Sequence, residues 1–424
     1  MTPSIAEVTN ELPAKLGLSG EKAVNADKSR DERFALYRKL VPLVNDETVT
    51  FLNASFSPPS NLVVHEAFTR YAHQALHDIR PKAKWQANTE AARELVAKYL
   101  KTSPSSIAFT RDTTEALGGF IRSVPFSPGD NVVVLDTEHP NHVYGWLALR
   151  DSGLEIRQVP TIKETGEVQA ATAETFAPYV DEKTVAIGLS SVMFHSGQWN
   201  DVKNICDTYR PHGIHVLADV TQQVGFADID VKELGVSAAA FSLHKGLNTP
   251  IGFAVLYVDE TVISQINPTP PIVGFGAVHN TRPDLLVPGD KVVYHPGTRR
   301  YEHLNLNFAA ATVARAWLEF YLDTLGPKEV EAHLYSLGDA LRAEAKKLGV
   351  RIVGPEDRKH HAPHLYILSL NKPGWMEHFD KHGVIVTQYR LGIRVSFGFY
   401  NNLTDVRRLA EIIKLGIEKG LVAQ

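Results

Sequence analysis

The residues Ala238-Ala-Ala-Phe-Ser-Leu-His-Lys-Gly-Leu-Asn-Thr-Pro250 lead from an apolar stretch into a loop that contains glycine and proline. A continuously apolar run of this kind predicts a β-strand that is covered on both faces of its sheet. Lys245 follows where this strand ends. Burial beside apolar neighbours lowers the pKa of a lysine, which leaves a free amine able to form a Schiff base with an aldehyde. The alternative for this stretch alone is an ordinary exposed lysine.

The same kind of run recurs along the chain and predicts the fold class. Short β-rich runs, mostly separated by segments of helix length, occupy residues 107–110, 131–136, 184–189, 214–219, 238–243 and 253–258. This alternation is typical of an α/β domain with a mainly parallel sheet. In such sheets, ligands bind at the carboxyl ends of the strands.

The chain divides into three expected regions. Residues 1–45 predict a polar N-terminal extension that joins the small domain, residues 46–325 a large domain, and residues 326–424 a smaller α+β domain. We expect a helix capped by Thr89 and a long helix from about Glu302 to Leu322. The Pro/Gly-rich segment 267–297 is too long for a simple connection, which predicts a functional or inter-subunit role.

Composition excludes several classes of protein. Of the 424 residues, 44% are hydrophobic and 22% charged, and the net charge is -4, which gives no electrostatic reason to expect nucleic acid or an anionic membrane as partner. A single cysteine, Cys206, excludes an intrachain disulfide. The sequence shows no secretory signal pattern and no apolar run long enough to span a bilayer. We therefore expect a cytoplasmic protein.

Polar clusters follow five of the predicted strands. They occupy residues 110–115, 136–142, 190–196, 219–222 and 244–245. Loops are polar in general, so any one of these clusters could arise by chance. Five clusters at the same edge of a sheet, with a lysine and an aspartate among them, predict one shared site.

Each candidate residue has a simpler alternative. Thr113 and Thr114 begin a predicted helix and could bind a phosphate, or one of them could serve only as a helix cap. Asp219 could pair with a pyridinium nitrogen, bind a ribose or a metal, or cap a turn. His139 or His142 could stack on a planar ring or be structural. Arg394 could bind a substrate carboxylate, or could form a salt bridge with a neighbouring element.

Several catalytic motifs are absent from the sequence. There is no P-loop, no G-x-S-x-G, no H-E-x-x-H and no C-x-x-C pair, and Gly274-Phe-Gly276 lacks the third glycine of a dinucleotide fingerprint. This absence weighs against a Rossmann-type dehydrogenase, and a catalytically silent binding protein is the other alternative. The run His360-His361-Ala-Pro-His364 lacks nearby acids and cysteines, so we expect a solvated loop and no metal site.

The clusters taken together resemble those of class V, fold-type I enzymes that depend on pyridoxal phosphate (PLP). This group contains cysteine desulfurases and isopenicillin N epimerase-like proteins. The resemblance runs from about residue 48 nearly to the end of the chain, and D-x-x-Q followed by S-x-H-K is its specific part. The matching residues are Phe51-Leu-Asn-Ala-Ser55, Thr113-Thr-Glu115, Glu138-His-Pro140, Asp219-Val-Thr-Gln222, Ser242-Leu-His-Lys245, Pro296-Gly-Thr298 and Arg394-Val-Ser396.

The resemblance implies a fold-type I fold, with a mainly parallel seven-stranded sheet, and a role for each matched residue. Lys245 would hold PLP as a Schiff base, Asp219 would pair with the pyridine nitrogen, and His139 would stack on the ring. Gln222 would contact the ring hydroxyl, and the phosphate would be held by Thr113, Thr114, Ser242 and His244. Thr298 would reach the phosphate of a second subunit, which implies a homodimer with shared sites. Substrate contacts would come from Arg394, Asn53, His195 and Tyr144.

Departures from the family pattern bear on the reaction. Cysteine desulfurases carry a thiol shortly before the Arg394 strand, but residues 383–392 contain none, and Cys206 lies in a predicted helix far along the chain. Persulfide chemistry is therefore not expected. His195 stands where desulfurases carry an asparagine, so its role stays open.

We expect an enzyme that makes an α-carbanion from an amino acid. The motif sets 111–115 and 138–146 resemble fungal biosynthetic members of the epimerase-like branch, such as the enzyme of the loline-alkaloid pathway. The leading hypothesis is therefore a secondary-metabolism enzyme that closes an azabicycle by carbon–carbon bond formation. A β-eliminating C–S lyase, of the kind that acts on hercynylcysteine sulfoxide, and an amino-acid epimerase are the alternatives.

Overall fold

The computed structural model describes residues 28–163, 166–270, 272–279 and 291–423. Its centre is a seven-stranded sheet in the order β2-β8-β7-β6-β5-β3-β4, in which β8 runs antiparallel to both neighbours and the other pairs are parallel. This arrangement confirms the predicted mainly parallel sheet. The strands are β2 (Ile107–Thr110), β3 (Asn131–Leu135), β4 (Glu155–Val159), β5 (Thr184–Ser190), β6 (His215–Asp219), β7 (Ala238–Ser242) and β8 (Ala254–Val258).

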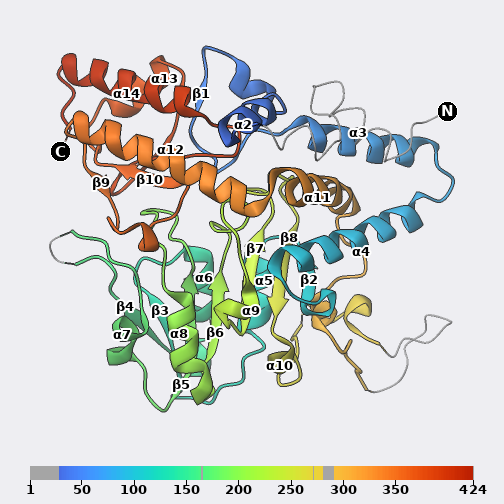
Figure 1. The fold of residues 1–424 in the computed structure, drawn as a ribbon. Helices are drawn as coiled ribbons and strands as arrows, with labels where there is room; N and C mark the ends of the chain where they lie inside the picture. The colour runs from blue at the N-terminus through green and yellow to red at the C-terminus, as the bar shows by residue number, and fades with distance from the viewer. Residues whose placement is uncertain (1–27, 164–165, 271, 280–290, 424) are drawn as a thin grey trace.

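Helices cover both faces of this sheet, which explains why its inner strands are apolar throughout (Figure 1). Successive side chains of a strand point to opposite faces. In β7, Ala238 and Ala240 pack with α5 and α6, whereas Ala239 and Phe241 pack in the larger core that includes α4, α8 and α11. The helices between the strands are α5 (Thr113–Ile121), α6 (Pro140–Leu147), α7 (Ala173–Phe176), α8 (Val202–Tyr209), α9 (Val231–Leu234) and α10 (Glu260–Ile263).

Three long helices pack around this large domain, and two of them differ from the sequence-based expectation. They are α3 (Leu62–His77), α4 (Pro81–Leu100) and α11 (Phe308–Phe320). Thr89 is not a cap: α4 begins two turns earlier at Pro81, and the Thr89 hydroxyl donates to the Trp85 carbonyl inside the helix. Proline suits a first helical position because its missing N–H has no partner there. The second helix begins only at Phe308, where the Asn307 side chain caps it, and a π-helical turn (Tyr321–Leu325) follows it.

The C-terminal region forms a second layer of helices and a small sheet. The four strands are antiparallel in the order β12-β13-β10-β9, and β11 pairs in parallel with β1 (Thr50–Phe51) from the N-terminal part of the chain. This matches the α+β character predicted for residues 326–424. The elements are α12 (Pro327–Lys347), β9 (Ile352–Val353), β10 (Leu365–Leu368), α13 (Trp375–Lys381), β11 (Val384–Ile385), β12 (Thr387–Tyr389), β13 (Gly392–Ser396) and α14 (Leu403–Glu418).

The N-terminal helix α2 (Arg30–Arg38) lies against this C-terminal region. The Phe34 ring stacks on the His333 ring of α12, with centroids 4.0 Å apart. Arg38 forms an ion pair of 2.7 Å with Asp405, at the start of α14. The described part of the predicted extension therefore contacts α12 and α14.

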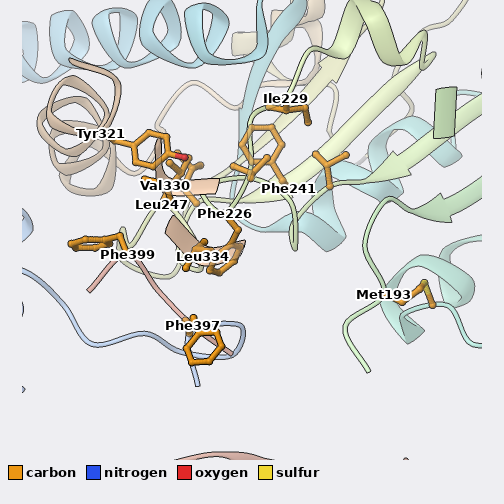
Figure 2. Packing of buried hydrophobic residues seen from close by; sticks show 14 of the residues in the cluster. Met193, Phe226, Ile229, Phe241, Leu247, Tyr321, Val330, Leu334, Phe397 and Phe399 are labelled. Carbon is orange, nitrogen blue, oxygen red and sulfur yellow. The ribbon is translucent and has the colours of Figure 1, made fainter. Parts of the chain in front are cut away.

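One hydrophobic cluster continues from the central sheet into the C-terminal region. Figure 2 shows Phe226 and Leu247 of the large domain close to Leu334 of α12, with Phe397 and Phe399 of the C-terminal region nearby. The loops after β6 and β7 are thus anchored on a shared core. Among the residues that the structure describes, no helix combines the length and the apolar character that a membrane span requires.

Candidate active site

A cavity of about 360 Å³ lies at the carboxyl ends of the parallel strands, where the β12–β13 hairpin of the C-terminal region faces them. This volume is in the range of small-molecule sites. The loops after β2, β3, β5, β6 and β7 all contribute to it, as the five polar clusters predicted. Predicted site residues that line the cavity are Thr113, Thr114, His139, Asp219, Gln222, Ser242, His244, Lys245 and Arg394.

Lys245 lies three residues beyond the end of β7 and lines the cavity. Burial lowers the pKa of this amine from 10.5 to about 8, Asp219 acts in the opposite direction, and Arg394 lowers the pKa further. The amine therefore loses its proton at a lower pH than an ordinary lysine does, which favours its use as a nucleophile or base. The neighbouring His244 is also in the cavity lining, and burial followed by the charge of Lys245 lowers its pKa to about 4.

Three hydroxyl groups meet where α5 begins. The Thr113 hydroxyl lies 2.6 Å from that of Ser242 and 3.2 Å from that of Thr221. The first N–H groups of a helix have no partner inside the helix and carry a partial positive charge. Hydroxyl donors beside these N–H groups make a binding site for a phosphate. Thr114 is the next residue of α5 and also lines the cavity.

Asp219 ends β6 with its carboxylate in the cavity lining. It is largely buried, and its Oδ1 accepts a hydrogen bond of 2.9 Å from the Thr221 N–H. The bond fixes the carboxylate at the point where the chain leaves the sheet. A fixed anion on a cavity wall is suited to pairing with a protonated ring nitrogen.

Glu138 supports His139 through hydrogen bonds. The Glu138 carboxylate is buried and accepts hydrogen bonds from the Ser190 N–H (2.5 Å), from the Ser190 hydroxyl and from the His139 N–H (2.7 Å). His139 caps α6 through its Nδ1, which accepts from the Asn141 N–H at 3.2 Å. Burial lowers the pKa of His139, the charge of Asp219 opposes this shift, and the charge of Lys245 adds to it.

The Gln222 side chain is held by Ser55, which also lines the cavity, and by the buried His364. The Gln222 side chain donates to the Ser55 carbonyl (3.1 Å) and contacts His364 (3.5 Å), whose ring stacks on Phe226. His361, in the same histidine run, is 1% exposed and His364 is fully buried, so the expectation of a solvated loop was wrong. Both rings pack on aromatic neighbours, which explains these histidines without a metal.

Arg394 is a buried cation without an acidic partner among the described residues. It is 1% exposed and donates to the Phe194 carbonyl (3.0 Å) and to the Asn53 side chain (3.5 Å), and its Nε is buried with no hydrogen-bond partner. Its guanidinium lies 4.6 Å from the centre of the Tyr389 ring, and burial lowers its pKa to about 10. The alternative of a structural salt bridge does not apply, so the guanidinium is available for a ligand carboxylate.

Four predicted residues lie outside the cavity lining. Asn53 supports Arg394 through its Oδ1, which also accepts from the Thr387 hydroxyl at 2.8 Å. Tyr144 is 67% exposed on α6. His195 lines a second, adjoining cavity. Thr298 is 1% exposed within its own chain and its hydroxyl is buried without a partner, so this conformation does not present it to a second chain.

The structure brings to the site three further residues that the sequence did not indicate. Thr221 lies inside the quoted Asp219-Val-Thr-Gln222 motif, and its position two residues after Asp219 could have indicated the hydroxyl that meets Thr113. Phe194 lies inside the quoted cluster 190–196. Tyr389 lies within residues 383–392, the segment that contains no thiol. For the two aromatic residues no sequence signal distinguishes a cavity wall from a core position.

The one cysteine is remote from this chemistry. Cys206 is buried in α8 and does not line the cavity, and burial raises the pKa of its thiol to about 12. A thiol with this pKa is protonated at neutral pH and is a poor nucleophile. Within the described residues no group of three or more His, Cys, Asp or Glu side chains is arranged to hold a metal ion.

The donor set of the cavity fits PLP. Hydroxyls at the start of α5 match the phosphate, the Asp219 carboxylate matches the ring nitrogen, and the Lys245 amine matches the aldehyde. The unpartnered Nε of Arg394 matches the carboxylate of an amino acid. Together with the seven-stranded sheet, this arrangement defines a fold-type I PLP-dependent enzyme.

Comparison with known proteins agrees with this class. The model of the class-V aminotransferase family matches residues 62–409, and the chain belongs to this family. An uncharacterized aminotransferase of Schizosaccharomyces pombe is 50% identical over 387 residues, which cover 91% of this chain and 96% of the relative. A probable cysteine desulfurase of Methanothermobacter thermautotrophicus is 28% identical and covers 88% of this chain and 89% of its own length.

Solved structures show the same fold. A variant of C-DES with glycine covalently linked to its PLP cofactor superposes with a TM-score of 0.80, at 19% identity, over 89% of this chain and 98% of its own length. C-DES is described as a cystine C–S lyase. The expectation of a PLP-dependent enzyme of the class V family is thereby confirmed.

Proposed function

We propose that the protein is a PLP-dependent lyase, which removes the α-proton of an amino acid and expels a substituent from the β-carbon. The observation that carries this proposal is the amine of Lys245, whose pKa is lowered to about 8, in one cavity with the Asp219 carboxylate and the unpaired Arg394 guanidinium. These groups suit a base, an anion for a ring nitrogen and a binding site for the substrate carboxylate. C-DES, a C–S lyase of the same fold, supports the choice of reaction.

Each residue has one task in this proposal. Bound PLP supplies an aldehyde for the substrate amine and a ring that withdraws electrons from the α-carbon. Arg394 binds the α-carboxylate and so orients the substrate, while Lys245 accepts the α-proton. The β-substituent leaves with its bonding electron pair and is protonated. Water then converts the released enamine into a keto acid and ammonium, so that atoms and charge balance.

Elimination requires no nucleophile beyond the lysine. Persulfide formation requires a thiol, and the described cavity lining contains none. We therefore do not extend the name of the desulfurase relatives to this chain.

Cyclisation by carbon–carbon bond formation is the second candidate function. A second cavity of about 300 Å³ shares Phe194 and Tyr389 with the first, and it offers space for an electrophile tethered to the α-carbon. Such a reaction would fit the role in alkaloid-type secondary metabolism that the sequence favours. An epimerase would return the proton to the α-carbon without using this space.

We also propose that the protein is a homodimer. Apolar residues are exposed on neighbouring segments of the large domain, among them Ile251, Leu304 and Phe275. Exposed apolar patches of this kind mark protein–protein contacts. A second copy is the occupant that the family resemblance favours.

The experiment is a product analysis in D2O with the PLP-loaded enzyme. S-propyl-L-cysteine and other β-substituted amino acids are expected to give pyruvate and ammonium in equal amounts. Exchange of the α-proton alone would indicate an epimerase, and a ring product without pyruvate would indicate the cyclase. Either result would overturn the lyase.

A lysine variant tests the base. The Lys245→Ala variant is expected to lose the yellow absorbance that borohydride reduces, and at least about 100-fold in rate, since a general base contributes about 10²–10⁴. Lys346→Ala, at an exposed position of α12, is the control and should keep both.

A further inference from the structure

The second cavity adjoins the proposed catalytic cavity. Its volume is about 300 Å³, and Phe194 and Tyr389 line both cavities. The two rings lie 5.6 Å apart and edge-on, and the Phe194 ring also contacts that of His139 at 5.1 Å. Phe194 and Tyr389 therefore form a wall that the two cavities share. A substituent on a substrate in the first cavity would reach the second by passing these rings.

The walls of the second cavity are apolar, but its polar groups carry both signs of charge. Ile162 and Leu391 contribute apolar surface, and the ionisable groups are Arg390, Asp136 and His195. Arg390 is exposed in the turn between β12 and β13, and no described acidic side chain lies within ion-pair distance of it. An unpaired cation at the edge of a cavity favours a ligand with a carboxylate.

Asp136 and His195 favour a second ligand group, one that donates hydrogen bonds. The Asp136 Oδ1 accepts from the Thr161 N–H (3.0 Å) and hydroxyl (3.1 Å), and the structure gives its other oxygen no partner. His195 has a lowered pKa, chiefly because of burial, while hydrogen bonding to the backbone of Thr137 and the charge of Asp136 oppose the shift. Its Nε2 is buried without a partner. In a neutral imidazole that donates through the other nitrogen, Nε2 is an acceptor.

Distance along the hairpin fits a ligand that bridges the two cavities. Thr387 is the β-sheet partner of Arg394, and Arg390 lies three residues further along the chain, in the turn that follows β12. Three residues of extended chain span at most about 10 Å. A ligand with one carboxylate at Arg394 and another at Arg390 therefore needs a spacer of several atoms between its two ends.

We infer that the second cavity binds the distal end of a substrate whose β-substituent terminates in its own ammonium and carboxylate groups. Arg390 binds the distal carboxylate, and Asp136 with His195 accepts hydrogen bonds from the distal ammonium. The aromatic pair contacts the apolar spacer. This inference rests on the proposed lyase function and specifies its substrate class: a thioether-linked pair of amino acids.

A matched series of substrates tests the inference. The four compounds are L-cystathionine, S-(3-carboxypropyl)-L-cysteine, S-(3-aminopropyl)-L-cysteine and S-propyl-L-cysteine, which carry both distal groups, the carboxylate, the amine or neither. With the PLP-loaded enzyme, kcat/KM is expected to rise about tenfold for each charged group, since a charge-assisted hydrogen bond corresponds to about a tenfold change. Cystathionine is expected to yield homocysteine, pyruvate and ammonium. Equal kcat/KM for all four compounds would overturn the inference and leave the lyase intact.

Variants locate each contact. Arg390→Gln is expected to lose about tenfold for the two compounds with a distal carboxylate and nothing for S-propyl-L-cysteine. Asp136→Asn is expected to act only on the two compounds with a distal amine. Arg407→Gln, an exposed arginine of α14, is the control and should leave all four values unchanged. A loss that is uniform across the series would also overturn the inference.

Binding provides a readout that does not need turnover. Calorimetry on the Lys245→Ala variant loaded with PLP is expected to give the same order of affinities, with L-cystathionine the tightest. If this order of affinities holds while the wild-type enzyme releases pyruvate from none of the four compounds, the lyase function fails and the distal subsite stands. If affinities do not differ, the subsite fails.

Discussion

Lys245 is subject to three opposing influences on its pKa. Burial lowers the pKa to about 8, the Asp219 carboxylate raises it and the Arg394 guanidinium lowers it. Only the unprotonated amine attacks an aldehyde, so covalent attachment of PLP to the apoprotein should accelerate as pH rises through about 8 and level off above it. Stopped-flow absorbance measures this rate. A midpoint near 10.5, the ordinary value, would contradict the assignment.

The pH dependence of PLP attachment also tests the effect of Asp219 on Lys245. In Asp219→Asn the charge that raises the pKa is removed, so the midpoint should move to lower pH. Asp207→Asn, an exposed aspartate of α8, is the control and should leave the midpoint at about 8.

The raised pKa of the buried Glu138 carboxyl group predicts that the stability of the fold depends on pH. Burial raises its pKa from 4.5 to about 7, hydrogen bonds from Ser190 and His139 oppose this, and the charge of Asp219 adds to it. The folded state therefore binds more protons than the unfolded state between pH 4.5 and 7. Its stabilising contribution is complete below pH 4.5 and is lost as pH rises through about 7. A shift of this size corresponds to at most about 3 kcal/mol.

Urea denaturation at several pH values measures this effect. In Glu138→Gln the unfolding free energy should fall less between pH 4.5 and 7 than in the wild type. Glu182→Gln, at an exposed position, should follow the wild-type curve. Parallel curves for Glu138→Gln and the wild type would show that the carboxyl does not titrate in this window.

Residue identities in the site were predictable where topology alone determines them. Lys245, Asp219 and Thr113 follow strands of a parallel sheet, and the carboxyl ends of such strands meet at one edge. Side-chain direction is not encoded in this way. His195 follows β5 and Tyr144 lies on α6, which follows β3, but His195 lines the second cavity and Tyr144 is exposed to solvent. No single-sequence pattern distinguishes these outcomes.

At the scale of elements, Arg38 links three parts of the chain. Its guanidinium donates to the Asp405 carboxylate (2.7 and 3.1 Å), to the Tyr400 carbonyl (2.8 Å) and to the Val44 carbonyl. The Asp405 side chain is 6% exposed. Arg38→Met would leave this buried carboxylate without a cation, which costs about 3–5 kcal/mol. We expect a loss of that size in the unfolding free energy.

A neighbouring arginine of the same helix provides the control. Arg33 pairs with Glu329, which is 48% exposed, so Arg33→Met should cost less than about 1 kcal/mol. Adding Asp405→Asn to Arg38→Met should recover part of the loss, because the unpaired charge is removed. Equal losses of unfolding free energy in Arg33→Met and Arg38→Met would indicate that burial of the Arg38–Asp405 pair does not affect stability.

Helix boundaries were predicted less well than strands, for a physical reason. The strands are short apolar runs whose burial determines their extent. Thr89 is a good cap residue by type, but α4 continues through it because Pro81 begins the helix two turns earlier and tertiary packing favours the longer element. Tyr389 shows the same limit, since only the pairing of β12 with β13 brings its ring against Arg394.

At the scale of the whole molecule, the fold class followed from the sequence because a sheet covered on both faces requires apolar strands. The contact of α2 with α12 and α14 depends on residues nearly 300 or more positions apart, such as Phe34 with His333 and Arg38 with Asp405. The Pro/Gly-rich segment 267–297 lies partly outside the described residues, at 271 and 280–290, so its predicted role stays a prediction.

Exposed apolar side chains on the large domain predict how two copies associate. Ile79, Ile251, Leu304 and Phe275 are 96%, 74%, 48% and 43% exposed. Their segments are neighbours: Asn307 donates to the Gly252 carbonyl (3.3 Å), Lys82 donates to the Asn305 side chain (3.1 Å), and the backbone at Gly276 closely approaches that of Leu304. Burying this surface against a second copy would remove it from water.

A charge in this surface should therefore weaken the dimer. Because an unpaired carboxylate is costly to bury, Ile251→Asp and Leu304→Asp should each raise the dimer dissociation constant by about 100-fold or more. Sedimentation velocity over a range of concentrations measures the constant. Val422→Asp, an exposed position near the C-terminus, is the control and should leave it unchanged. A wild-type protein that sediments as a monomer at micromolar concentration would refute the proposed dimer.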